Sequence, residues 1–275
     1  MKSQSKVARG AVYVSAFLTF FMLIVLVGYI IIKGAPNLTP AMFEKVYTTE
    51  NVSMFPAIVT TLIVVILSLI IATPLGIFTG CYLVEYAKKG SRLVETIRLA
   101  TETLSGIPSI LYGLFGMLFF GTALHLGYSI MSGVLTLSIM ILPLIIRSTE
   151  EALLAVDDTL RSGSLALGAG KLRTIVRVVL PVAIPGILSG VILAIGRCVG
   201  ETAALMFTLG TTTDMPTSLM SSGRTLSLHM YVLSTEGMYV KEAFATGFIL
   251  IILTLLINGL SSLIGSKLSG GKQNA

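Results

Sequence analysis

Apolar runs of about 20 residues recur along this chain and limit what it can fold into, because a run of that length spans the roughly 30 Å hydrocarbon core of a bilayer as a helix. Hydrophobic residues make up 54 % of the chain and charged residues only 12 %, which agrees with a membrane protein. A transmembrane β-barrel would show alternating segments of about 10 residues, and these are absent from the sequence. The sequence therefore predicts an all-α membrane protein.

Six spans are expected, in one membrane domain over residues 1–275. The spans cover residues 11–32, 55–83, 104–124, 129–146, 182–209 and 243–264. The first span follows several cations, as a signal peptide would. It is too long for the apolar core of a signal peptide, and no small-x-small cleavage site follows it, so we expect a retained anchor.

The distribution of cations predicts the orientation of the spans. With both termini in the cytosol, 14 of the 19 Lys and Arg residues fall in cytosolic segments and 4 fall outside. Such an excess marks the cytoplasmic side of a membrane protein. The net charge of +6 is thus explained by topology and needs no nucleic-acid partner.

The cytosolic connection over residues 150–181 is too patterned for a passive loop. Asp158 is the expected N-cap of a helix that runs to Leu165, and Gly168 is expected to end that helix in a left-handed conformation. A second helix then separates apolar residues from cations on opposite faces. The pattern predicts a helix, a turn and a helix presented to the cytosol.

Two interpretations of this connection stay open. A basic amphipathic helix that lies on anionic headgroups accounts for the second helix. It does not account for Leu165, Ala166 and Leu167, which lie at the tip of the loop, away from the expected lipid surface. Apolar residues facing water favour a soluble partner that covers them.

From Leu160 onward the connection resembles the cytoplasmic loop of ABC importer permeases. Their pattern is Glu-Ala-Ala, three residues, Gly, nine residues and Ile-x-Leu-Pro. Here Gly168 precedes nine residues and then "VVLP", while "SGS" replaces the Glu-Ala-Ala triplet. The resemblance implies a coupling helix that inserts into a groove of a cytoplasmic ATPase. The residues expected to take part are Leu160, Arg161, Leu165, Ala166, Leu167, Gly168 and Ala169.

Two further stretches, "SGIPSILYGLFGMLFF" and "GRCVGETAALMFTLG", resemble the membrane subunits of phosphate importers, of the PstA type. The resemblance covers residues 54–264. It implies a type I ABC importer permease in a bacterial or archaeal plasma membrane. The implied partners are a dimeric ATPase, a second homologous permease and an extracytoplasmic phosphate-binding protein.

The second of these stretches carries Arg197 and, four residues later, Glu201 inside an apolar run. This spacing predicts a salt bridge on one helical face. The pair reduces the penalty of about 2.5–3.5 kcal/mol for an ionisable side chain at the membrane centre. One interpretation is that the pair only fastens the helix to its neighbours. The other is that Arg197 binds phosphate in the translocation path, held by Glu201 and assisted by the hydroxyl of Thr202.

Proline and glycine interrupt the third and fifth spans. These residues predict either close helix packing or a gate. The candidate gate or hinge residues are Gly106, Pro108, Pro185 and Gly200.

The chain is expected to be a transport subunit and not an enzyme. The nearest approach to a nucleotide-binding loop, Gly170-Lys171, has Leu165 in place of the first glycine. No cluster of His, Cys, Asp or Glu has the spacing of metal ligands, so neither a metal nor a cofactor is expected. Two alternatives remain: an importer of sulfate, molybdate, tungstate or phosphonate, and a secondary anion carrier, which would leave the loop unexplained.

Overall fold

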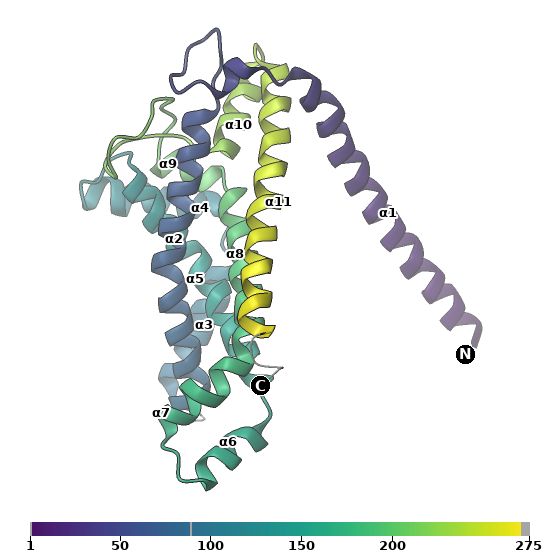
Figure 1. Cartoon of the computed structure of the whole chain (residues 1–275), viewed down its shortest axis with the longest axis vertical. Coiled ribbons are helices and arrows are strands. Elements are labelled where there is room, and N and C mark those ends of the chain that lie inside the picture. The colour runs from purple at the N-terminus through teal and green to yellow at the C-terminus, as the bar shows by residue number, and fades with distance from the viewer. Residues whose placement is uncertain (1, 89, 271–275) are drawn as a thin grey trace.

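The computed structural model describes residues 2–88 and 90–270, and the regular elements in this part of the chain are helices (Figure 1). The α-helices are α1 (Lys2–Gly34), α2 (Phe55–Cys81), α3 (Arg92–Gly106), α4 (Ser109–Gly116), α5 (Ile130–Leu154), α6 (Asp158–Ala166), α7 (Lys171–Thr174), α8 (Leu180–Val199), α9 (Ala203–Thr208), α10 (Leu226–Glu236) and α11 (Val240–Gly270). The 3₁₀ turns are η1 (Ala35–Asn37) and η2 (Pro40–Phe43). The π-helical segments are η3 (Tyr82–Tyr86), η4 (Met117–Ala123) and η5 (Ile175–Val179).

Five helical segments of the described residues are long and apolar enough to cross a membrane. They are Arg9–Asn37, Phe55–Tyr86, Ile130–Leu154, Lys171–Val199 and Val240–Leu263. A sixth crossing is formed if α3 and the α4–η4 segment count as one broken span. The expected spans at 11–32, 55–83, 129–146 and 243–264 fall on α1, α2, α5 and α11.

The centre of the molecule is the contact of α5 with α2 on one side and with α8 on the other. In lipid, helices gain little from burying apolar area against each other, so close van der Waals contact has to hold them together. Gly76 and Gly80 of α2 allow this approach: a Cβ at Gly76 would lie 2.6 Å from a carbon of Ile145, and a Cβ at Gly80 would lie 2.7 Å from one of Thr149.

The expected third span, over residues 104–124, is wrong as a single helix. It breaks between Gly106 and Ser109, where α3 and α4 meet at 105°. Pro108 disfavours a helical conformation at Ile107, which is extended with φ −72° and ψ 129°. The Tyr112 hydroxyl donates a hydrogen bond of 2.7 Å to the carbonyl of Leu104, which satisfies one acceptor at the broken end.

The expected fifth span, over residues 182–209, also proves to be two helices. α8 begins at Leu180, continues through Pro185 and ends at Val199. Gly200 caps it, and α9 starts only at Ala203. Residues 200–202 therefore lie between the two helices and belong to neither.

The outer end of the bundle holds η1, η2, α10 and the loops around them, and α6 lies at the opposite end (Figure 1). The beginning of α1 and the end of α11 are both on the α6 side. α1 packs against α11 near the outer end, where the rings of Tyr29 and Phe244 meet edge to face at 5.6 Å. From there α1 leans away from the bundle, and none of the residues in its apolar window is buried.

Candidate functional site

Arg197 lies in the last turn of α8 and is half-buried. It lines a cavity of about 560 Å³ between α5, α8 and α11. The other lining residues are Leu144, Ser189, Ile192, Leu193, Gly196 and Asn258. The cavity walls are thus mainly apolar, and the guanidinium brings a positive charge to them.

The expected salt bridge between Arg197 and Glu201 is wrong. Because α8 ends at Val199, the spacing of four residues no longer places the two side chains on one helical face. In the described part of the chain, no carboxylate lies within 4.0 Å of the Arg197 nitrogens. The Arg197 side chain also has no hydrogen bond to another described residue.

Glu201 instead caps α9. Its carboxylate accepts a hydrogen bond of 3.0 Å from the backbone N–H of Ala204, in the first turn of that helix. The residue is only 8 % exposed, and its carbonyl accepts a further bond of 2.7 Å from the Ser227 hydroxyl at the start of α10. A carboxylate at a helix N-terminus is favoured by the free N–H groups and by the helix dipole.

The hydroxyls of Thr202 and Thr208, near this site, donate hydrogen bonds to backbone carbonyls of the same segment. The Thr208 hydroxyl donates to the carbonyl of Ala204 at 2.9 Å, and that of Thr202 to the carbonyl of Gly200 at 3.4 Å. Among the three candidate path residues, the side chains of Glu201 and Thr202 make hydrogen bonds to backbone groups of this chain. The N–H donors of Arg197 have no acceptor among the described residues. The five N–H donors of a guanidinium suit an anion that offers several acceptor oxygens, such as a carboxylate or a phosphate.

The candidate hinge residues lie at two different kinds of position. Gly106 and Pro108 flank the 105° bend, and Gly200 lies at the break between α8 and α9, whereas Pro185 is inside a continuing helix. A gate role for these residues stays a prediction.

The cytosolic connection contains the helix that its pattern predicts. α6 covers Asp158–Ala166, and Gly168 adopts the expected left-handed conformation with φ +84°. The expected N-cap is wrong by one residue, because Asp157 is the extended residue whose carboxylate accepts from the N–H of Thr159 at 2.8 Å. These hydrogen bonds to Thr159 hold the pKa of Asp157 below its ordinary value.

The apolar tip of this connection is open to solvent. Leu160 and Leu165 are exposed, and Leu167 is 90 % exposed. α6 has no buried residue. Its outward surface is therefore free to contact another molecule.

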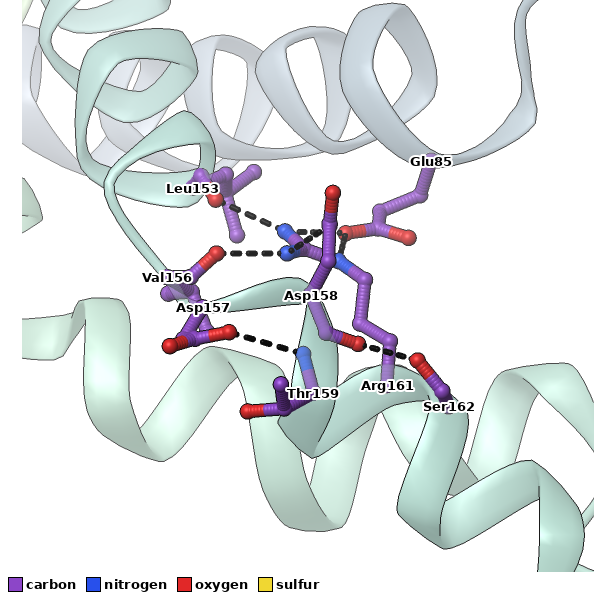
Figure 2. Close-up of polar contacts among 8 residues, drawn as sticks. All are labelled: Glu85, Leu153, Val156, Asp157, Asp158, Thr159, Arg161 and Ser162. Carbon is purple, nitrogen blue, oxygen red and sulfur yellow. Dashed lines mark hydrogen bonds and ion pairs between the residues drawn. The ribbon is translucent and has the colours of Figure 1, made fainter.

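Arg161, which was expected among the docking residues, points the other way (Figure 2). Its guanidinium donates to the carbonyls of Leu153 and Val156, both at 2.7 Å, and pairs with the Glu85 carboxylate at 3.0 Å. The Arg161 and Glu85 side chains are only 17 % and 9 % exposed. We call these four residues the Arg161 cluster. Sequence reasoning missed Glu85 because nothing near it in the chain marks a partner 76 residues away.

A second buried arginine lies at the outer end of the molecule. Arg224 is 5 % exposed and lies 5.2 Å from the ring of Tyr47, and its Nε and Nη2 atoms have no hydrogen-bond partner among the described residues. His229 of α10 is buried against the same ring at 6.2 Å. Burial lowers the pKa of His229 to about 3, and the Arg224 charge acts in the same direction.

Comparison with protein families gives one match that covers most of the chain. The family described as "Binding-protein-dependent transport system inner membrane component" matches residues 72–270. The matched region contains α3 to α11, including Arg197 and the Arg161 cluster.

Curated relatives align over nearly the whole chain. The "Probable ABC transporter permease protein YqgI" of Bacillus subtilis (strain 168) is 33 % identical over 288 residues, which cover 97 % of this chain and 97 % of the relative. The "Phosphate transport system permease protein PstA" of Yersinia pestis is 32 % identical over 252 residues, covering 90 % of this chain and 85 % of the relative.

Solved structures of transporters have the same fold. A chain of a bacterial alginate ABC transporter, in complex with an alginate pentasaccharide-bound periplasmic protein, superposes with a TM-score of 0.67 at 15 % identity, over 96 % of this chain and 97 % of that one. A chain of the MetNI methionine ABC transporter, in an inward-facing conformation, gives a TM-score of 0.59 at 19 % identity, over 78 % and 94 %. At these identities the likeness concerns the fold alone.

Proposed function

The chain belongs to the binding-protein-dependent transport system inner membrane component family as an ABC importer permease, and from this premise we propose that it is a membrane subunit of an ATP-driven importer of inorganic phosphate. It forms half of the translocation pore, and a second, homologous permease forms the other half. A cytoplasmic ATPase dimer supplies the energy, and an extracytoplasmic binding protein delivers the substrate.

The free guanidinium of Arg197 is the observation that carries the choice of an anion. It lies at a cavity in the membrane-spanning bundle, without a carboxylate within ion-pair distance in the described residues. An unpaired cation at this depth is expensive, so its retention favours a role in binding. A phosphate can pair with it during transport and leave again, because conduction needs a site that also empties.

Phosphate is preferred over other oxyanions on the strength of the relatives. Several relatives at 32–40 % identity bear the name of the phosphate transport system permease PstA. The guanidinium itself does not separate phosphate from sulfate, molybdate, tungstate or a phosphonate, because all of them present acceptor oxygens to it.

The exposed tip of α6 supports the proposed coupling to an ATPase. Its apolar side chains are those that a groove in a partner would cover, and the left-handed Gly168 ends the helix beside them. The residues proposed to contact the ATPase are Leu160, Leu165, Ala166, Leu167, Gly168 and Ala169.

The function is tested by uptake of radiolabelled phosphate into vesicles that contain the complete importer. We expect uptake that needs ATP and continues when the proton gradient is collapsed. Arg197→Ala should reduce this uptake by about 100-fold or more, as expected when a charged hydrogen-bonding group is removed from a binding site. Leu193→Ala is the matched control, because Leu193 lines the same cavity without a charge.

Three outcomes would change the proposal. Normal uptake by Arg197→Ala would remove Arg197 from the path, and loss of the assembled complex in that variant would give it a purely structural role. Uptake that follows the proton gradient in place of ATP would identify a secondary carrier. Stronger competition by sulfate or molybdate than by unlabelled phosphate would assign another oxyanion.

A further inference from the structure

We propose that Arg161 is a positioning residue that makes the coupling helix α6 move together with α5 and α2. The inference rests on the proposed docking of an ATPase on α6. It assigns to Arg161 a role inside the permease and removes it from the docking surface.

The guanidinium of Arg161 uses all of its donors within this chain. A guanidinium carries five N–H groups. Nε and one N–H of Nη2 point to the Glu85 carboxylate at 3.0 Å. The other N–H of Nη2 points to the Leu153 carbonyl. Nη1 donates to the Val156 carbonyl at 2.7 Å and to the Asp158 carboxylate at 2.9 Å (Figure 2). No donor of Arg161 is left for a partner protein.

The acceptors of the Arg161 cluster belong to the ends of two membrane spans. Leu153 lies in the last turn of α5, where its carbonyl accepts one backbone bond of 3.3 Å from the N–H of Val156, and Val156 lies just beyond the helix. The carbonyls at a helix C-terminus can accept further bonds from a side chain. Glu85 lies on η3, the π-helical continuation of α2. A cation at a helix C-terminus is also favoured by the helix dipole. One side chain of α6 thus binds the cytosolic ends of both α5 and α2.

A second set of contacts connects the coupling helix to α8. The hydroxyls of Ser164 in α6 and Thr174 in α7 are 2.9 Å apart, and α7 leads through η5 into α8. α6 is also joined along the chain to α5, through residues 155–157, whereas α2 contacts α6 through the pair of Glu85 with Arg161. When the ATPase displaces α6, the cluster therefore decides whether α2 follows and whether the end of α5 keeps its orientation to α6.

The geometry requires arginine at this position. A lysine ammonium has three donors and no planar fork, so it cannot serve two carbonyls and a carboxylate in these directions. Arg161→Lys keeps the charge and removes the geometry. Glu85→Gln keeps a similar shape and removes the charge that draws α2 to α6.

The experiment uses the complete importer reconstituted in proteoliposomes. Three quantities are measured: the ATPase that co-purifies with the permease, the ATP hydrolysed, and the phosphate taken up. We expect Arg161→Lys and Glu85→Gln to retain the bound ATPase and to take up roughly tenfold less phosphate per ATP hydrolysed, the size of effect seen along coupling networks. A purely structural role would reduce the yield of complex without changing this ratio.

Asp158→Asn is the matched control. It removes the charge from one contact of the same guanidinium, but the Asp158 side chain is 93 % exposed and belongs to α6 itself. The control should keep the ratio of the unaltered importer, which would assign the effect to the contacts with α5 and α2.

Two results in the variants would overturn the inference. An unchanged ratio in both Arg161→Lys and Glu85→Gln would show that α5 and α2 need no such link. Loss of the ATPase from both variants would return Arg161 to the docking surface. If Arg161→Lys does not accumulate, Glu85→Gln decides alone. An unaltered complex without bound ATPase would overturn the proposed docking, and this inference with it.

Discussion

Two arginines of this chain show how the partners of a side chain decide its role. Arg197 lies inside an apolar run and Arg161 lies in the polar stretch that forms α6, and sequence reasoning predicted a contact with another molecule for each. All five N–H donors of Arg161 point to acceptors of its own chain, whereas Arg197 has no hydrogen bond to any described residue. Only the second is therefore free to bind an anion.

At Glu201 the structure predicts a capping effect and no charge pairing. Glu201→Ala leaves the N–H of Ala204 without its acceptor and should lower the free energy of unfolding by about 1–3 kcal/mol. Glu201→Gln keeps an acceptor oxygen and should lower it by less. Thermal unfolding of the purified protein in detergent measures the order of the two variants. Equal losses would indicate that the charge, and not the cap, is what Glu201 contributes.

His229 predicts a dependence of stability on pH. Burial lowers its pKa from 6.5 to about 3, with a further contribution from Arg224, so the unfolded chain binds a proton more readily than the folded one. The contribution of the neutral His229 to the free energy of unfolding is fully present above pH 6.5. This contribution is lost as the pH falls from 6.5 toward 3. Between pH 7 and pH 5 the loss due to this residue should be about 2 kcal/mol.

Thermal unfolding at pH 7 and pH 5 tests this prediction. His229→Gln should unfold with less difference between the two pH values than the unaltered protein does. His125→Asn is the control, because His125 is exposed in a left-handed conformation that asparagine tolerates. An undiminished difference in His229→Gln would show that other groups cause it.

At the scale of elements, two glycines at the cytosolic tip should respond in opposite directions to the same change. Gly163 lies inside α6, and an added Cβ would meet no atom within 4 Å, so Gly163→Ala should stabilise the helix by about 1 kcal/mol. Gly168 has equal space but a φ of +84°, so Gly168→Ala should destabilise the turn by about 1–2 kcal/mol.

Hydrogen exchange of the α6 amides measures both effects. Protection should rise in Gly163→Ala and fall in Gly168→Ala. Because Gly168 ends the helix that presents the apolar tip, its variant should also bind less ATPase. A shift of both variants in the same direction would contradict the role of the left-handed turn.

The sequence predicted helices more reliably than their ends. Run length and composition placed α1, α2, α5 and α11, because about 20 apolar residues leave few alternatives in lipid. At Pro108 and Gly200 the sequence predicts only close helix packing or a gate, and not a break in the helix. The size of the breaks depends on contacts distant in the fold, such as the hydroxyl of Tyr112 at the end of α3.

The candidate site shows the same limit. Arg197 was found because a charge in an apolar run is visible in one dimension. The predicted salt bridge between Arg197 and Glu201 was wrong, because the argument from their spacing assumed an unbroken helix and α8 ends at Val199. The inward orientation of Arg161 could not be predicted, since Glu85 is brought to it by the packing of α2 against α5.

For the whole molecule, the orientation in the membrane is open to a direct test. With Cys81 and Cys198 replaced by alanine, Leu167→Cys and Val46→Cys each supply one reactive thiol at positions that are 90 % and 71 % exposed. A membrane-impermeant maleimide should label residue 46 in intact cells and residue 167 only in inverted vesicles. Bound ATPase should protect residue 167. Labelling of residue 167 from outside would reverse the assigned orientation.

The lean of α1 has a consequence for biosynthesis. Its apolar window packs against almost nothing in its own chain, and its partner α11 follows every other span in the sequence. The ribosome adds about 5–20 residues per second, and contacts form as the chain emerges. About 200 residues separate α1 from α11, so α1 lies in the bilayer without its partner while they are translated. The contact between Tyr29 and Phe244 can close only after α11 is inserted, which makes it one of the last events in the assembly of the subunit.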